Sequence, residues 1–217
     1  MNRCKLWLER FLKAFLIIFT CCLLIFLLFD WFVSEKQPIA TVWKLPLNTT
    51  DRQNWATIVL EHDANFKALR APFGNVMLHH HTGIDLQNGS VIQSGEPVYP
   101  IAAGKIVSIE DPPPQRRITI EHLLPDGNKV WSVYVHIIDE QVKIGDIVDT
   151  ETVIARLMNA AELEIFGQEY NHVHLEIMKK IPSYASGYDQ RKTFTCYTED
   201  EVDEYFYDPE KFLKDHF

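Results

Sequence analysis

The chain has 217 residues, of which 47% are hydrophobic and 24% are charged, and its formal net charge is −9. This length is enough for one domain of ordinary size with a real core. The first 13 residues carry Arg3, Lys5, Arg10 and Lys13 against Glu9, a net +3, which leaves −12 for the remainder. A domain with this negative charge repels the phosphate backbone of nucleic acids, so we expect no nucleic-acid binding.

Residues 14–33 predict a transmembrane signal anchor. The run from Ala14 to Phe29 is uncharged and almost wholly apolar, and twenty helical residues span about 30 Å, the thickness of a bilayer core. The basic tail 1–13 precedes the run, which predicts a cytoplasmic N-terminus and a domain in the periplasm or on the outer side of the cytoplasmic membrane. A cleaved signal peptide is the alternative, but its apolar core is normally about 7–15 residues long and ends at a small-residue cleavage site.

Residues 34–64 are interpreted as a linker and helical region. The part over 34–50 reads as a linker that leads away from the membrane, and 51–70 has the moderate periodicity of a short helix. Only Cys196 among the four cysteines lies beyond the anchor. The domain therefore has no internal disulfide and no thiolate zinc site.

The sequence from 65 to 217 predicts a mainly β domain, an antiparallel sandwich or barrel-like body of many short strands. Residues 125–128, Pro-Asp-Gly-Asn, predict a hairpin between two β-rich runs. Asp208 and Pro209 predict the start of a short C-terminal helix with proline at its first position.

The spacing of the histidines indicates which of them are candidate ligands. His172 and His174 lie two apart on a predicted strand, so both rings, and Glu176 after them, project from one face. His81 and Asp85 lie four apart, about 13 Å along a regular strand, which is too far for one ion. Gly83 between them permits backbone angles that would bend the chain. Solvent-facing histidines and a charged turn are the ordinary alternatives.

The other histidines give weaker signals. His80 is expected to point to the side opposite His81, and His79 lies two residues further from the bend, so neither is given a role. His136 is either a buried hydrogen-bonded ring or a site residue. Two histidines and one carboxylate leave a fourth position open for water, which is the pattern of a catalytic zinc site. These ligands suit zinc without excluding other divalent metals.

Three separated motifs resemble those of the lysostaphin/LytM-type zinc endopeptidases, which cut peptide bonds in bacterial peptidoglycan. HTGID at 81–85 is similar to H-x-G-x-D, VYVHI at 133–137 to Y-x-H, and HVHLEI at 172–177 to H-L-H-F-E-I. Their order is that of the family, and the context matches over about residues 65–215.

The resemblance implies one zinc ion per domain, bound by His81, Asp85 and His174. It also implies two catalytic histidines that are not ligands, His136 and His172. Zinc-bound water would attack the peptide bond, with these two as base and oxyanion stabiliser in either order. The implied fold is a β-sheet groove of the duplicated hybrid motif type, related to lipoyl-type barrels.

Three further positions are interpreted beside the motifs. Glu176 is either a group that orients a ligand imidazole or a solvent-facing strand residue. His122 lies where relatives often carry a histidine, and we interpret it as structural. Residues 158–171 are longer and poorer in glycine than the family's corresponding stretch, which borders the groove.

The expected function is therefore a membrane-anchored zinc endopeptidase that hydrolyses peptidoglycan cross-links or stem peptides. Its expected partners are peptidoglycan peptides, the membrane and a regulatory protein. The alternative is a non-catalytic cell-wall binding or regulatory module that activates another wall hydrolase. Family behaviour adds the hypothesis that a segment such as 34–70 covers the groove and inhibits it. A lipoyl or biotinyl carrier role is disfavoured, because no lysine lies in a motif of that kind.

Overall fold

The computed structural model describes residues 13, 15–20, 22, 36–60, 64–72, 76–87, 95–167, 172–181 and 195–217. The chain divides into two units, Met1–Lys36 and Gln37–Phe217, and all the strands named below belong to the second. Almost all of the expected basic tail and most of the expected membrane anchor lie outside the described residues. Within the described part, no helix is both long enough and apolar enough to cross a membrane.

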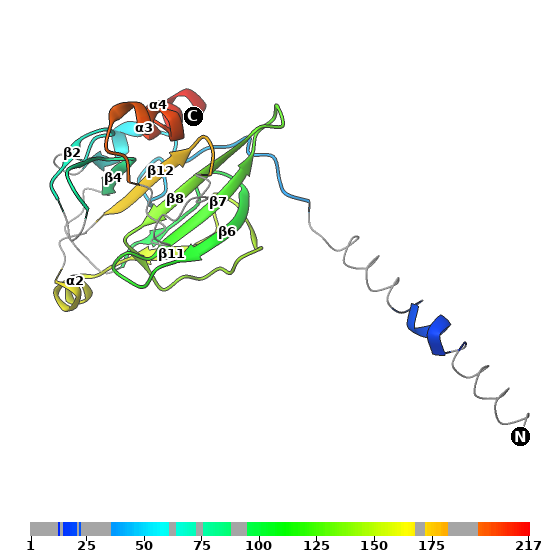
Figure 1. Ribbon diagram of the computed structural model, residues 1–217. Helices are drawn as coiled ribbons and strands as arrows, with labels where there is room; N and C mark the ends of the chain where they lie inside the picture. The colour runs from blue at the N-terminus through cyan, green and yellow to red at the C-terminus, as the bar shows by residue number, and fades with distance from the viewer. Residues whose placement is uncertain are drawn as a thin grey trace, which may run out of the picture. The chain divides into compact units, whose positions relative to one another are not determined.

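One antiparallel sheet holds eight of the described strands, in the order β1-β4-β12-β8-β7-β6-β10, with β13 paired to β12. The strands are β1 (Val59–Leu60), β4 (Ile84–Gln87), β6 (Gly104–Glu110), β7 (Arg117–Leu123), β8 (Lys129–Val135), β10 (Ile147–Val148), β12 (Val173–Met178) and β13 (Phe206–Tyr207). Figure 1 shows β12, β8, β7 and β6 side by side. The predicted hairpin is confirmed, because β7 and β8 pair directly across residues 124–128.

A smaller antiparallel sheet runs β5-β11-β9, and β2 pairs with β3. The bounds are β2 (Leu69–Arg70), β3 (His79–His80), β5 (Pro97–Val98), β9 (Ile137–Ile138) and β11 (Ala155–Leu157). The main hydrophobic core takes side chains from both sheets, among them Tyr134 and Leu175 from the large one and Val98 and Leu157 from the small one. The prediction of a mainly antiparallel β fold is therefore confirmed.

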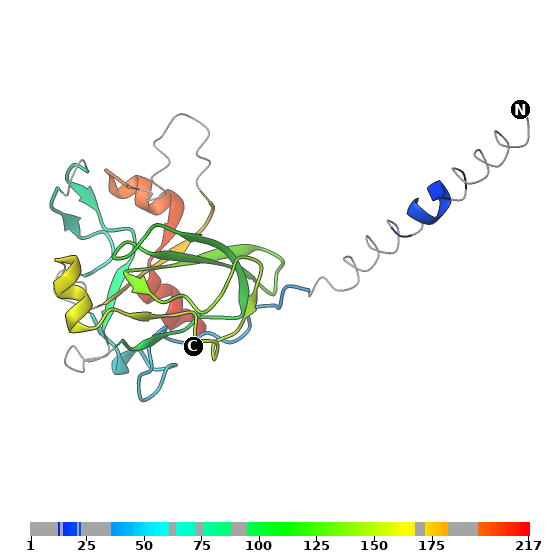
Figure 2. The same cartoon turned by 90° about the horizontal axis from the view of Figure 1, so that it is seen from below.

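The described helices of the domain are short: η1 (Trp55–Thr57), α2 (Ala160–Phe166), α3 (Glu199–Tyr205) and α4 (Pro209–His216). The predicted C-terminal helix is confirmed, since the Asp208 carboxylate accepts from two backbone N–H groups and Pro209 is the first helical residue. Figure 2 shows α4 lying against the large sheet, and its Phe212 and Leu213 are part of the main core.

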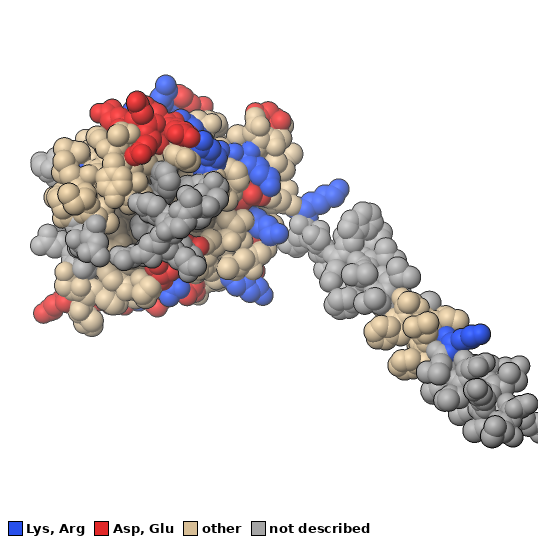
Figure 3. All heavy atoms as spheres, viewed as in Figure 1, with Lys and Arg blue, Asp and Glu red and all other residues tan. Residues whose placement is uncertain are grey.

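Acidic side chains gather over α3, as Figure 3 shows at the place where Figure 1 draws this helix. Lysines from other segments pair with them. Lys67 lies 2.7 Å from Asp203, and Lys180 lies 2.7 Å from Glu204. Exposed ion pairs of this kind contribute little to stability, so we regard this patch as a solvated face and assign no site to it.

The expectation of a linker before the domain is wrong. Residues 37–50 carry Trp43, Leu45 and Leu47, which are 2%, 0% and 0% exposed in the main core. A β-bridge ties Trp43 to Ala102. These side chains are as much part of the domain as the strands, so the domain begins at residue 37 and not at 65.

The short helix expected over residues 51–70 is also absent from the described part of that segment. It holds the single turn η1 and the two-residue strands β1 and β2 instead. β1 pairs with β4 and β2 pairs with β3. The apolar residues there contact the sheet as strands, which overrides their weak helical periodicity.

Candidate metal centre

Asp85 and His174 meet because their strands are paired in register. β4 and β12 are antiparallel neighbours, and Asp85 is directly opposite His174. Leu175 belongs to the main core. Because alternate residues of a strand share a face, His172, His174 and Glu176 project from the face opposite to that core.

His81 reaches the same point through a bend between β3 and β4. The chain leaves strand geometry at Thr82 and Gly83 before β4 begins, which confirms the predicted break. The reason we expected is wrong, because Gly83 does not have a positive φ. A Cβ atom on Gly83 would instead lie 2.3 Å from the carbonyl oxygen of Leu175. Glycine is required so that the bend can pack against the backbone of β12.

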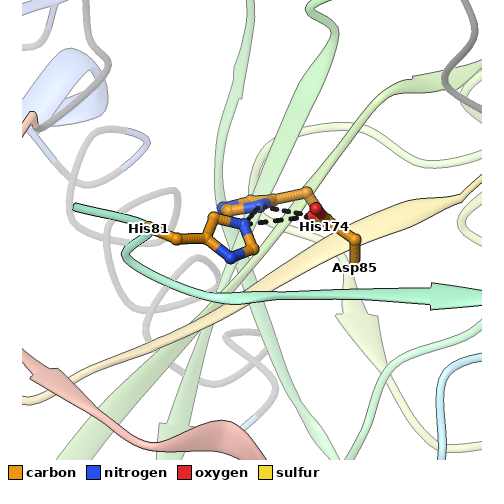
Figure 4. Close-up of side chains that lie close together, drawn as sticks. All are labelled: His81, Asp85 and His174. Atoms are coloured by element: carbon orange, nitrogen blue, oxygen red, sulfur yellow. Dashed lines mark hydrogen bonds and ion pairs between the residues drawn. The ribbon is translucent and has the colours of Figure 1, made fainter. Parts of the chain in front are cut away.

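Three donor atoms converge on one point, as Figure 4 shows. Nδ1 of His174 lies 2.8 Å from Nε2 of His81 and 2.9 Å from Oδ1 of Asp85. The third side of the triangle, from His81 Nε2 to Asp85 Oδ1, is 3.2 Å. Donors of a tetrahedral zinc ion with bonds of about 2.0 Å lie about 3.3 Å apart. The three residues therefore fit three corners of a zinc site and leave the fourth corner for water.

The second nitrogen of each ligand imidazole is already hydrogen-bonded. Nδ1 of His81 donates to the carbonyl oxygen of Asn65 at 3.0 Å. Nε2 of His174 lies 3.1 Å from Oε1 of Glu176, which also accepts from the hydroxyl of Thr82 at 2.5 Å. Because these nitrogens are bonded to other groups, the lone pairs of His81 Nε2 and His174 Nδ1 are the ones directed at the point where the three donor atoms converge, which we call the metal point. Glu176 is buried, so it contacts a ligand imidazole and does not face solvent.

Charges at this point are strongly coupled. Burial alone would raise the pKa of Asp85, but hydrogen bonds with His174 and His81 hold it well below its usual range. Burial alone would lower the pKa of His174, but hydrogen bonds with Asp85 and Glu176 raise it to about 9. His174 is thus a cation between two carboxylates, and metal binding has to displace its Nδ1 proton.

Two further histidines flank the three donors. The ring centroids of His136 and His172 are 5.1 Å apart, and Nε2 of His172 lies 3.6 Å from Oδ1 of Asp85. Nδ1 of His136 donates to the carbonyl oxygen of Pro114 at 3.0 Å. Burial and the neighbouring charges of His172 and His174 lower the pKa of His136 to about 3, so this ring is neutral near pH 7.

A strained backbone brings His136 to the site. Tyr134 on β8 faces the main core, and Val135 faces the other side. By strand alternation His136 would return to the core. Its φ of +65° breaks the alternation and places the ring beside His172. A non-glycine residue in this region costs about 1–2 kcal/mol, and such strain is typical of functional positions.

The remaining members of the histidine triplet lie outside the cluster. Nδ1 of His79 contacts the carbonyl oxygen of Met77 at 3.0 Å, and Nδ1 of His80 contacts that of Lys67 at 3.1 Å. His122 is fully buried and hydrogen-bonded to interior groups on both ring nitrogens. That environment agrees with the structural role we gave it.

Sequence reasoning missed three groups beside the donors: the carbonyl of Asn65, the hydroxyl of Thr82 and the guanidinium of Arg70. Arg70 contacts both Asp85 and His81. Thr82 lies inside the H-x-G-x-D motif, next to the ligand His81, and this position is the signal that could have indicated its role. A backbone carbonyl leaves no signal in a sequence, and Arg70 lies outside the motif, which starts at His81.

One family model and several solved structures are similar to this chain. Residues 79–186 match the family model of Peptidase family M23. The fold is similar to lysostaphin from Staphylococcus simulans, with 19% identity and a TM-score of 0.47, over 82% of this chain and 56% of that one. A zinc-containing peptidase from Vibrio cholerae has 22% sequence identity and a TM-score of 0.43. The match covers 64% of this chain and 37% of that one.

A catalytic-domain variant of the M23 protein EnpA from Enterococcus faecalis gives 18% identity and a TM-score of 0.38, over 57% of this chain and 82% of that one. No curated protein matches this chain. The chain spans 56% of the length of lysostaphin and 37% of that of the Vibrio cholerae peptidase.

The family match and the converging donor atoms of two histidines and an aspartate support a metallopeptidase-type domain. The matched residues 79–186 contain all three motifs of the resemblance. The chain belongs to peptidase family M23.

Proposed function

We propose that this chain is a membrane-anchored, zinc-dependent endopeptidase that hydrolyses peptide bonds in peptidoglycan cross-links or stem peptides. One observation carries the proposal. Nε2 of His81, Nδ1 of His174 and Oδ1 of Asp85 converge on one point, and the second nitrogen of each imidazole is already bonded elsewhere. Membership of peptidase family M23 supports peptide hydrolysis as the reaction.

The three donor residues would hold the zinc ion. When bound, zinc supplies a Lewis acid that activates water and polarises a peptide carbonyl. His136 keeps its N–H on the carbonyl of Pro114, so the lone pair of its Nε2 is suited to accept a proton from the attacking water. His172, whose ring lies next to that of His136, is suited to donate a hydrogen bond to the developing oxyanion.

The proposed location is the outer side of the cytoplasmic membrane. The apolar run 14–33 after a basic tail supports this orientation, in which the domain would lie on the side where peptidoglycan lies. We also propose that the β fold is of the duplicated hybrid motif type, with a groove over the sheet. Peptidoglycan peptides are the proposed substrate, and a regulatory protein is a proposed partner.

The experiment is peptide release from peptidoglycan sacculi by the full chain, purified in detergent and assayed for zinc content. We expect about one zinc ion per chain and soluble peptides from the sacculi. His174→Ala should abolish release, whereas His79→Ala should leave it unchanged. Release by the folded His174→Ala protein at the wild-type rate would contradict the proposal. A zinc-loaded wild type that releases nothing would favour the regulatory module instead.

A further inference from the structure

The short segment 64–70 lies along the metal motif. The backbone N–H of Asp85 donates to the carbonyl of Ala64 at 3.3 Å, and that of His81 donates to the carbonyl of Ala68 at 2.9 Å. β2, at the end of this segment, pairs with β3. All of these contacts come from residues ahead of position 79, where the family match begins.

Arg70 ends this segment, and its side chain reaches the donor residues. Its Nη2 lies 3.1 Å from Nδ1 and 3.1 Å from Nε2 of His81. The same nitrogen donates to Oδ2 of Asp85. The side chains of Arg70 and Asp85 are 29% and 5% exposed, so their ion pair is largely shielded from solvent.

The position of the guanidinium leaves the donor atoms open. An atom equally far from both nitrogens of one imidazole does not lie on the lone-pair axis of either, so Arg70 lies against the ring of His81. On Asp85 it takes Oδ2, whereas Oδ1 faces His81 and His174. The two oxygens of the carboxylate thus have separate partners, the guanidinium on one side and the metal point on the other.

We propose that Arg70 is a positioning residue of the metal centre, which holds the Asp85 carboxylate through Oδ2 so that Oδ1 points at the metal. The inference rests on the proposed zinc site. A carboxylate that binds through one oxygen can rotate, and a charge-assisted hydrogen bond from a planar guanidinium to the other oxygen restricts this rotation. Outer partners of metal ligands typically contribute 10- to 100-fold in affinity.

A cation this close to a divalent ion also repels it, and this effect has the opposite sign. The carboxylates of Asp85 and Glu176 flank His174, at 2.9 Å from its Nδ1 and 3.1 Å from its Nε2. The two carboxylate charges therefore offset the charge of Arg70 within the site. We expect the ordering of Asp85 to outweigh the repulsion, and the direction of the change in zinc affinity on removal of Arg70 decides between the two effects.

The test compares the zinc affinity of the full chain with that of Arg70→Met, by competition with a chelating indicator. We expect the affinity to fall about 10- to 100-fold. The visible absorption of the Co²⁺-loaded variant should differ from that of wild type, because the ligand geometry relaxes. Arg70→Lys keeps the charge without the planar fork and should recover part of the affinity. Arg156→Met is the matched control, since Arg156 bonds Glu162 outside the site, and it should bind zinc like wild type.

Zinc binding by folded Arg70→Met that equals or exceeds that of wild type would overturn the inference, and tighter binding would identify Arg70 as a competitor of the metal. If Arg70→Met does not fold, Arg70→Lys decides the question. Weaker zinc binding with an altered Co²⁺ spectrum supports the inference, and unchanged values overturn it. Failure of the wild-type chain to bind zinc would overturn the metal centre together with the role of Arg70, which separates that failure from one that concerns Arg70 alone.

Discussion

The backbone carbonyl of Asn65 accepts a hydrogen bond from Nδ1 of His81 at 3.0 Å, so a residue outside the family match holds a candidate metal ligand in place. The segment 37–50 before it contributes buried side chains to the main core. The described residues of 37–60 and 64–70 are therefore parts of the folded domain, which argues against the hypothesis that a segment such as 34–70 is a separate inhibitory cover over the groove.

Removal of residues 1–70 is accordingly expected to abolish folding and not to raise activity. The deletion takes Trp43, Leu45 and Leu47 out of the core. Since a single large-to-small core change typically costs about 2–5 kcal/mol, losing all three costs about as much as the whole stability of a typical domain, which is about 5–15 kcal/mol. Circular dichroism and thermal melting measure the outcome. A chain that starts at Gln37 is the control and should melt cooperatively, and a folded, more active 71–217 fragment would show this account to be wrong.

Asp85→Asn is expected to weaken zinc binding by more than about 100-fold, because loss of an outer partner alone costs 10- to 100-fold and this change neutralises a ligand. Its size and shape are kept, so the fold should survive. Competition with a chelating indicator gives the affinity. Asp139→Asn, which alters a half-exposed carboxylate bonded to Arg156, should bind zinc normally. Equal affinities of the two variants would rule out Asp85 as a ligand.

Gly83→Ala is expected to lower the free energy of unfolding by about 3 kcal/mol, as overpacking against fixed backbone does. The added Cβ would lie 2.3 Å from the carbonyl oxygen of Leu175. Gly127→Ala provides the comparison, because Gly127 has a φ of +86° but open space around its Cβ position. Backbone strain alone should cost that variant about 1–2 kcal/mol. Urea denaturation distinguishes the two, and equal losses would remove the steric explanation.

His136→Asn is expected to lower peptide release by about 10²- to 10⁴-fold, the usual contribution of a general acid or base. Asparagine tolerates a positive φ better than most residues. The free energy of unfolding of the variant should therefore be within about 1 kcal/mol of that of wild type. Denaturation and sacculus assays on the same preparation measure both quantities. A large loss of stability alongside the loss of activity would indicate a structural role for His136.

The pH dependence of stability should contain a contribution from His122. Burial lowers its pKa to about 4, below the ordinary value of about 6.5. The folded state then binds fewer protons than the unfolded state, so stability present above about pH 6.5 is lost as the pH falls toward 4, by about 3 kcal/mol in total. Urea denaturation at several pH values should show that His122→Gln loses less free energy of unfolding than wild type as the pH falls. Identical slopes for variant and wild type would argue against this assignment.

Local patterns predicted the centre of the site better than its surroundings. Strand periodicity placed His172 and His174 on one face, and the β4–β12 pairing brought Asp85 to them. The contacts of Arg70 depend instead on the two-residue pairing of β2 and β3, which is too short to leave a periodic signal. The buried residues of 37–50 contact the sheets through single bridges, so they carry no strand pattern and read as a linker.

The direct opposition of Asp85 and His174 has a consequence for folding. β4 is only four residues long, and its outer neighbour β1 has two, so pairing alone specifies the alignment of this part of the sheet weakly. A slip of one residue would turn Ile84 outward and bury Asp85 in the core. The three donor atoms converge in one alignment only. A bound metal ion would therefore stabilise the sheet in its native register and in no other.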